Sequence, residues 1–403
     1  MRRSPKPSFF EPDHRMDLRP RIDDSHLYGP ALDAGLDGIR MLVDHTARGM
    51  FAAALVGTDD VHAETFLGPS VADDAAAQPA AVAGHGVRKA LLDYLLDEGR
   101  LTLDEQGRVR ASSTLTVAAA ERQSADALVS TRPELADARE LLGVFERRAA
   151  DLLAGADGIT ILRDTLGFQR MQALWERLTL HLPQRRVERQ LGAELLIERM
   201  RRQRSGITVL ECGAGVGSVL RTALELPGFI AAVDALERYV YTDINPFLIE
   251  WSKDWFRRNA PPALFARMEF QVLDLDAGSC TQSPAAGSVD LVILDDVAHD
   301  VVDVVATLQW LGTLLSADGW LAMIENFRQP ARDFLFIEIF PITFHSYNKA
   351  RLGRGSRINR GFMSLPEWRS ALEQAGLQAL QVVPDPHHHH RWPMGGIVAA
   401  CRA

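Results

Sequence analysis

The fold is decided by VLECGAGVG, residues 209–217, in which Gly213, Gly215 and Gly217 recur at every second position. The stretch continues the apolar run ITVLEC, residues 207–212, so the pattern predicts a buried strand, then a glycine-rich turn and then a helix. Glycine lets the backbone of such a turn approach a ligand closely, where a Cβ would obstruct it. The dinucleotide fingerprint would need glycine at Ser218, and the lysine of a P-loop is missing. The turn therefore predicts a ligand site without naming the ligand.

From residue 207 onward, short apolar runs alternate with helical segments such as NPFLIEWSKDWFRRN. The seven runs are ITVLEC, YVYTDI, MEFQVLDL, VDLVILDD, GWLAMIEN, LQALQVV and GGIVAAC. Such alternation predicts βαβ units and a mainly parallel sheet, here of seven strands. Ser364 and Glu367 predict a capping box for the helix before the last two strands. We therefore expect an α/β, Rossmann-like core over residues 201–403.

The first half of the chain has a different pattern. Residues 31–200 show helical periodicity almost throughout and predict a helical lid or substrate domain, while residues 1–30 predict a flexible arm. Residues 87–111 predict a helix followed by two short strands, as in a winged helix. Three acidic residues accompany the basic ones on that helix, and DNA reading needs a basic face, so DNA binding is disfavoured. The stretches 72–83 and 117–127 predict loops or flexible joints.

Composition excludes several classes of protein. With 403 residues, 47% hydrophobic and 24% charged, the chain is typical of a globular protein of two or three domains. Its formal net charge of -9 disfavours nucleic acid and anionic membranes as partners. The three cysteines, Cys212, Cys280 and Cys401, predict neither a disulfide framework nor a zinc site. No apolar run reaches 18 residues, so we expect a cytoplasmic protein.

Acidic residues stand where predicted strands end. Glu211 lies within the glycine motif, Asp243 ends the second strand, and Asp274 and Asp276 follow the third. Ligands bind at the carboxyl ends of strands in open α/β sheets. An acid that ends the second strand can accept hydrogen bonds from both hydroxyls of a ribose, and one after the third can accept from an adenine amino group.

These residues resemble class I S-adenosylmethionine-dependent methyltransferases, whose motif of apolar strand, acid and G-x-G-x-G matches VLECGAGVG. The resemblance implies a seven-stranded sheet with a reversed final hairpin and S-adenosyl-L-methionine as the cofactor. The residues that it places at the cofactor are Glu211, Gly213, Gly215, Gly217, Asp243, Ile244, Asp274, Leu275 and Asp295.

The second half of the core is similar to the methyltransferases of polyketide synthase and nonribosomal peptide synthetase lines. In that group the fourth strand ends N-V-L-H-A-T and the fifth ends in Glu. Here residues 296–299 read DVAH, and Glu325 ends the fifth strand. His299 and Glu325 are 26 positions apart (325 minus 299), which is the spacing of the His/Glu pair of the C-methylating members. The sequence departs from the pattern at Asp296, at Asp300 and in the turn 317–319.

The resemblance implies C-methylation of an activated carbon in natural-product biosynthesis. His299 would remove the proton of the substrate, and Glu325 would orient the imidazole. O-methylation of a hydroxyl or carboxylate stays open, because the same pair can deprotonate an oxygen. A cofactor-binding cyclase, isomerase or regulator without methyl transfer stays open as another class.

The implied substrate is a small molecule or an acyl group tethered to a carrier protein, and a homodimer is left open. The basic run KARLGRGSRINR, 349–360, is a candidate contact for a phosphopantetheine arm, an acidic carrier or a carboxylate. The four histidines 387–390 could bind a metal, but a solvated loop is favoured and no metal is predicted. A free-standing enzyme is expected, with an excised domain as the alternative.

Overall fold

We describe a computed structural model of the chain, which covers residues 30–54, 61–68, 79–112, 119–202, 206–277, 284–328, 338–348, 361–383 and 395–402. Residues 1–29 of the predicted arm, the basic run 349–360 and the histidines 387–390 lie outside these described residues. Within the described ranges, no helical segment has the length and hydropathy of a transmembrane span.

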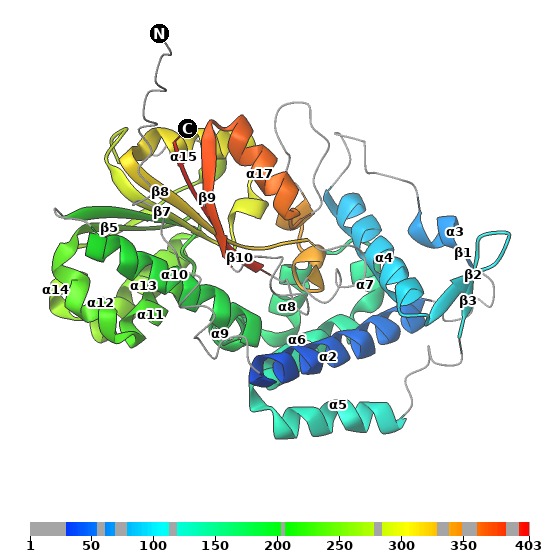
Figure 1. Cartoon of the computed structure of the whole chain (residues 1–403). Coiled ribbons are helices and arrows are strands. Elements are labelled where there is room, and N and C mark those ends of the chain that lie inside the picture. Colours follow the sequence, from blue (N-terminus) through cyan, green and yellow to red (C-terminus); the bar gives the residue numbers. More distant parts are fainter. Residues whose placement is uncertain are drawn as a thin grey trace, which may run out of the picture.

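Seven strands form one sheet in the order β6-β5-β4-β7-β8-β10-β9 (Figure 1). They are β4 (Ile207–Cys212), β5 (Leu236–Asp243), β6 (Met268–Val272), β7 (Val289–Asp295), β8 (Leu315–Asn326), β9 (Leu377–Val383) and β10 (Gly395–Arg402). β10 runs antiparallel to both β8 and β9, whereas the other pairs are parallel. The predicted Rossmann-like α/β core with its reversed final hairpin is therefore confirmed.

Alternate residues of the central strands face opposite sides of the sheet. Val209 of β4 and Leu291 of β7 pack into the apolar core on one side, and Leu210 and Val292 pack into the core on the other. All four side chains are buried. Because helices cover both faces, both sets must be apolar, which explains why these strands are continuous apolar runs in the sequence.

Two sets of helices cover the two faces of the sheet (Figure 1). One face carries α10 (Pro183–Arg202), α11 (Ser218–Glu225), α12 (Pro227–Ala232), α13 (Pro246–Asn259) and α14 (Pro262–Phe265). The other carries α15 (Val304–Leu314) and α17 (Leu365–Gln374). The predicted capping box begins α17, with the Ser364 backbone N–H donating to Glu367 at 2.7 Å.

The N-terminal part is helical, as predicted. Its helices are α2 (Pro30–Ala54), α3 (Ala63–Leu67), α4 (Pro79–Asp97), α5 (Ala119–Thr131), α6 (Ala136–Arg147), α7 (Ala149–Leu153), α8 (Gly158–Leu166) and α9 (Phe168–His181). After α4, strands β2 (Leu101–Leu103) and β3 (Arg108–Ala111) form the predicted hairpin, and β1 (Val61–His62) pairs with β3.

The loops predicted over 79–83 and 117–127 are wrong, because α4 begins at Pro79 and residues 119–131 form α5, while 72–78 lie outside the described residues. Ala125 is buried in the core of the N-terminal part, and Leu128 packs against that core. Alanine is the strongest helix former, and packing against α2 supplies the stability that a weakly amphipathic sequence does not reveal.

A segment that follows β8 joins the two parts of the chain. Its residues Ile342 and Phe344 belong to the apolar core of the N-terminal helices, although they fall in the range predicted as the cofactor-binding core. The backbone N–H of His345 donates to Oδ1 of Asp157 at 3.1 Å. Tyr347 of the same segment contacts His299 at the edge of the sheet. The helical part is thus connected directly to the carboxyl ends of the strands.

Candidate active site

The glycine-rich turn after β4 adopts a backbone that only glycine accommodates well. Gly213 and Gly215 both lie in the left-handed region, with φ of 60° and 56°. A Cβ on Gly213 would come within 2.4 Å of Cγ2 of Val297, so the turn packs tightly on the loop after β7. On Gly215 the nearest atom would be 3.9 Å away, so this glycine faces open space in which a ligand can approach the backbone.

The carboxylate of Asp243 holds this turn against the end of β5. Its Oδ2 accepts from the N–H of Gly215 at 2.9 Å, and its Oδ1 accepts from the N–H of Asn245 at 2.8 Å. Burial raises the pKa of Asp243, and the two backbone donors oppose the rise. The next residue, Ile244, is 61% exposed. The oriented carboxylate can accept hydrogen bonds from ribose hydroxyls, and the exposed apolar side chain beside it can pack on an aromatic base.

Glu211 lies in the middle of the sheet, beneath the glycine turn. Its side chain is completely buried, and Oε2 accepts from the Tyr239 hydroxyl at 2.7 Å. Burial raises the pKa of Glu211 to about 8. Its Oε1 is buried without a hydrogen-bond partner among the described residues. A buried acceptor of this kind is costly unless a ligand or water satisfies it.

The end of β6 lies beside that of β5, because the N–H of Leu273 donates to the carbonyl of Asp243 at 3.0 Å. Asp274 is exposed there and accepts from the N–H of Asp276 at 2.9 Å. Leu275 is buried. Of the two residues predicted here, only Asp274 presents a polar group to solvent.

Asp295 is engaged by neighbouring side chains. Its Oδ1 accepts from Nη2 of Arg185 at 3.0 Å, and its Oδ2 accepts from the hydroxyl of Ser218, the first residue of α11. Arg185 comes from α10 and also donates to Glu188 at 2.6 Å. All four side chains are buried. The arrangement fixes the glycine turn, α10 and the end of β7 to one another.

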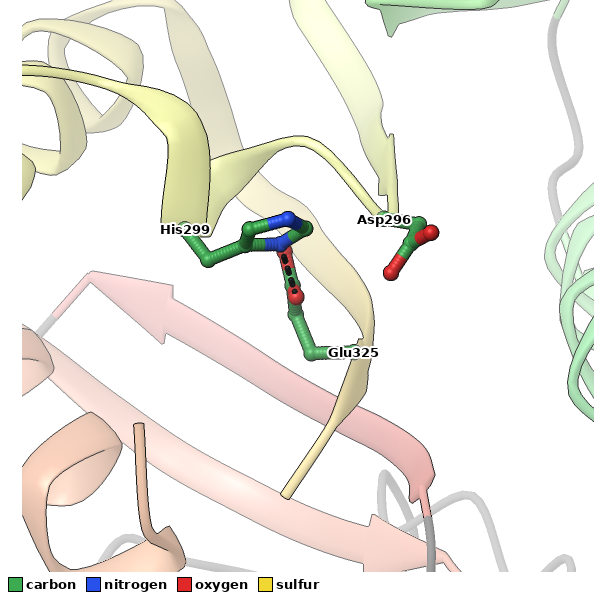
Figure 2. A group of neighbouring side chains, drawn as sticks. All are labelled: Asp296, His299 and Glu325. Atoms are coloured by element: carbon green, nitrogen blue, oxygen red, sulfur yellow. Dashed lines mark hydrogen bonds and ion pairs between the residues drawn. The ribbon is translucent and has the colours of Figure 1, made fainter. Parts of the chain in front are cut away.

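His299 and Glu325 are brought together from adjacent strands (Figure 2). β7 and β8 are parallel with Asp295 opposite Ile324, so the residues that follow these two lie side by side. His299 sits in the 3-10 turn Ala298–Asp300 after β7, and its Nδ1 lies 2.8 Å from Oε2 of Glu325. The other oxygen of Glu325 accepts from the N–H of Ala298 at 2.8 Å.

This pair holds a proton tightly. Burial alone would lower the pKa of His299, but the carboxylates of Glu325 and Asp300 raise it, to about 10. Burial also raises the pKa of Glu325, and the imidazole opposes that rise. Because both pKa values are raised, the pair carries one titratable proton at neutral pH. The nearby carboxylates stabilise the form in which this proton is on the imidazole.

Two aromatic rings enclose the imidazole of His299. The ring of Phe362 packs edge-on at a centroid distance of 4.5 Å, and that of Tyr347 at 5.6 Å. The hydroxyl of Tyr347 accepts from the Phe362 N–H at 2.7 Å, which fixes the two rings to each other. His299 therefore has one orientation, with Nδ1 toward Glu325.

Asp296 lies next to this pair (Figure 2). Among the described residues it is the one non-glycine residue with a positive φ, 57°, and its Oδ1 accepts from Asn326 at 3.0 Å. One atom each of Asp296, His299 and Glu325 lie within 4.8 Å of one another, a spacing that a metal ion could bridge. Oδ1 of Asp296 is already engaged by Asn326 and lies 3.6 Å from Nη1 of Arg185, and Glu325 is paired with His299. We therefore interpret the cluster as an acid–base group and not as a metal centre.

Comparison with known proteins identifies the family. Residues 184–382 match the family model described as a methyltransferase domain. This segment is a methyltransferase domain. The match confirms the predicted recognition, a class I S-adenosylmethionine-dependent methyltransferase, and with it the predicted cofactor.

Two curated relatives extend the match. The chain is 29% identical over 201 residues to methyltransferase calH of Penicillium decumbens, covering 48% of this chain and 51% of the relative. It is 28% identical over 245 residues to polyketide methyltransferase ustM of Ustilaginoidea virens, covering 59% and 52%. The chain thus spans about half the length of these relatives.

The solved structure of the CurJ carbon methyltransferase superposes with a TM-score of 0.70 at 17% identity, over 96% of this chain and 97% of that one. At this identity the likeness concerns the fold. It covers the N-terminal helices as well as the methyltransferase domain.

The roles of several residues at the methyltransferase site are not visible in the sequence. Arg185 lies in PQRRVERQ, where closely spaced charges indicate an exposed helical face, and nothing in the sequence shows that it is buried against Asp295. Tyr347, an aromatic residue that the sequence suggests for an apolar substrate pocket, and Phe362 lie in the two ranges 338–348 and 361–383, and nothing in the sequence shows that both rings pack on His299. In the sequence, Ser218 stands out only as a departure from the dinucleotide fingerprint, whereas in the structure its hydroxyl donates to Asp295.

Proposed function

We propose that this chain transfers the methyl group of S-adenosylmethionine to an activated carbon of a polyketide-like acyl substrate. The observation that carries the proposal is the buried pair of His299 and Glu325, 2.8 Å apart where β7 and β8 end. The polyketide methyltransferase and the carbon methyltransferase named above support the substrate class and the reaction.

The cofactor is proposed to bind along the ends of β4, β5 and β6. The open side of Gly215 would admit it next to the backbone, Asp243 would accept from the ribose, and Ile244 would pack on the adenine. The unsatisfied Oε1 of Glu211 fits a ligand that carries hydrogen-bond donors. Asp274 and Leu275 would border the adenine, and Gly213, Gly217 and Asp295 would shape the turn.

The proposed mechanism needs one base and a fixed geometry. When bound, the cofactor supplies a methyl group on a positively charged sulfur. Nδ1 of His299 is occupied by Glu325, so Nε2 is the nitrogen that would take the proton from the substrate carbon. Glu325 would orient the ring and stabilise the imidazolium that forms. Because the pair retains a proton at neutral pH, we expect transfer to become faster as the pH rises toward about 10, the raised pKa of His299.

The helical region 31–200 is proposed to be the lid over the substrate, and residues 201–403 the cofactor-binding core. The contacts of His345 and Tyr347 support this assignment, since they connect the helices to His299. The substrate is a small molecule or an acyl group carried on a protein, and both belong to the proposal.

The test is an assay of methyl transfer with the purified chain, S-adenosylmethionine and β-ketoacyl thioesters, free or carrier-bound. We expect the acceptor to gain one methyl group and the demethylated cofactor to accumulate in equal amount. His299→Ala should reduce the rate by about 10²- to 10⁴-fold, the range for loss of a general base. His181→Ala, an exposed histidine at the end of α9, is the matched control and should transfer normally.

An acceptor that is rearranged without a gain in mass would contradict methyl transfer and favour a cyclase or isomerase. Near-normal transfer by His299→Ala would remove His299 as the base. Equal binding of the cofactor by the wild type and His299→Ala, measured by calorimetry, shows that the loss is one of chemistry.

A further inference from the structure

The proposed base is closed off from water on most sides. The side chains of His299 and Glu325 are 4% and 0% exposed, and the rings of Tyr347 and Phe362 cover the imidazole. Nδ1 is taken by Glu325, so a proton gained from a substrate would sit on Nε2. Turnover requires this proton to leave, because each methyl transfer to carbon releases one proton.

The charged groups around the ring differ in their access to solvent. Glu325 and Glu338 are buried, and Glu338 is paired with Arg328 at 3.1 Å. Asp296 is partly exposed, but its Oδ1 is held by Asn326 and Arg185. Tyr347 is buried, and burial raises its pKa well above its usual value, so it stays neutral.

Asp300 is different because it reaches both the ring and the surface. Its Oδ1 lies 3.9 Å from Nε2 of His299 and is itself shielded from solvent, while the side chain as a whole is 39% exposed. The turn that carries it is anchored on both sides: the Asp300 N–H donates to the carbonyl of Val297 at 3.0 Å, and the Val302 N–H donates to Asp276 at 2.5 Å.

We propose that Asp300 relays the proton between Nε2 of His299 and the solvent. The inference rests on the proposed function, since it assumes that His299 is the base. A gap of 3.9 Å is too long for a hydrogen bond, but such contacts at catalytic groups commonly shorten only in the working complex.

The proton is accounted for at each step. The substrate C–H bond breaks as Nε2 takes the proton, and its electron pair forms the new bond from carbon to the methyl group. The bond between methyl and sulfur breaks, and its pair stays on sulfur as a neutral thioether. The N–H bond at Nε2 then breaks as an O–H bond forms on Asp300. Water or a buffer base removes the proton, because a carboxylate binds it more weakly than imidazole.

The first test measures kcat for Asp300→Asn and Asp300→Ala at fixed pH and ionic strength, while the concentration of a small buffer such as imidazole is varied. In dilute buffer we expect kcat to fall about tenfold or more with unchanged KM, and to recover as the buffer concentration rises. Asp303→Asn is the matched control in the same loop, since asparagine keeps the cap that Asp303 gives to α15. The control should not depend on the buffer.

A kcat for the Asp300 variants that equals that of the wild type, or that is lowered equally in every buffer, would overturn the relay. The second outcome would assign Asp300 a structural role.

A second measurement does not depend on turnover. Histidine-selective ¹⁵N NMR titration should show a lower pKa for His299 in Asp300→Asn than in the wild type, with no change in Asp303→Asn. If that shift is present and the wild type does not transfer methyl groups, the contact stands and the proposed function fails. If the shift is absent, Asp300 does not communicate with His299 and the relay fails.

Discussion

At the ends of β4 and β5, backbone N–H groups of the glycine turn donate to a carboxylate and a carbonyl, whereas charged side chains pair with one another where β7 and β8 end. At the first edge the N–H of Gly215 donates to Oδ2 of Asp243, 28 positions away, and the N–H of Ala214 donates to the carbonyl of Thr242. At the second edge Arg185 reaches Asp295 across 110 positions, and His299 meets Glu325.

This difference explains why the cofactor site can be predicted from local sequence patterns and the catalytic site much less so. The N–H groups of the glycine turn need only small residues at fixed spacing and one acid at the end of β5, so the cofactor edge is a short motif and a strand that ends in Asp. A side-chain contact can come from any segment that the fold brings close. The residues at the ends of β7 and β8, which we call the catalytic edge, therefore come from α10, the turn after β7, the end of β8 and the segment that carries Tyr347. Changes at the two edges should therefore fail in different ways.

The largest expected effect is at the junction of the two edges. Replacing Arg185 with Met removes the cation that pairs with Asp295 at 3.0 Å and donates to Glu188 at 2.6 Å in a buried site. Loss of one partner from a buried ion pair costs about 3–5 kcal/mol. We expect the free energy of unfolding, measured by urea denaturation, to fall by that amount. Arg257→Met, on an exposed pair in α13, is the control and should change it by less than about 1 kcal/mol. An equal loss of unfolding free energy in Arg185→Met and Arg257→Met would show that the buried contacts of Arg185 do not stabilise the fold.

The glycine turn offers a matched pair of substitutions. Gly213→Ala and Gly215→Ala each place a Cβ in the left-handed region, which costs about 1–2 kcal/mol. Gly213→Ala also forces its Cβ against Val297, so its total cost should be about 2–5 kcal/mol. Gly215→Ala keeps more stability but intrudes on the open space beside the backbone, so it should weaken cofactor binding more than it weakens the fold. Thermal unfolding with and without the cofactor separates the two effects, and identical behaviour of the two variants would contradict the assignment.

The catalytic edge should respond to pH. A His299 pKa raised to about 10 means that the neutral imidazole is scarce at pH 7 and increases as the pH rises. The rate of transfer should therefore increase through the alkaline range in the wild type. In Glu325→Gln the charge that raises the pKa is gone while burial still lowers it, so the increase should occur at lower pH, with a reduced maximum. The pH dependence of kcat/KM measures the midpoint and the maximum in the wild type and in Glu325→Gln. An unchanged midpoint in Glu325→Gln would show that Glu325 does not set the proton affinity of His299.

Much of this molecule follows from its sequence, and the two edges show why the rest does not. The strand runs, the glycine turn and the helix cap at Ser364 are local patterns, and each is found where its pattern places it. The spacing of His299 and Glu325 was informative because parallel neighbouring strands bring matching positions together. Burial of Arg185 and the packing of Tyr347 on His299 depend on tertiary contacts that leave no periodic signal. The helix α5 was missed because packing on α2 stabilises it.

The central claim is that His299 activates a carbon for methylation, and one measurement tests it most directly. The purified chain is supplied with S-adenosylmethionine that carries a ¹³C-labelled methyl group and with a β-ketoacyl thioester, and the product is examined by ¹³C NMR. We predict a labelled methyl group bonded to carbon with the wild type, and formation of that product about 10²- to 10⁴-fold more slowly with His299→Ala that still binds the cofactor. A label bonded to oxygen, or the same carbon-methylated product from His299→Ala at a comparable rate, would contradict it.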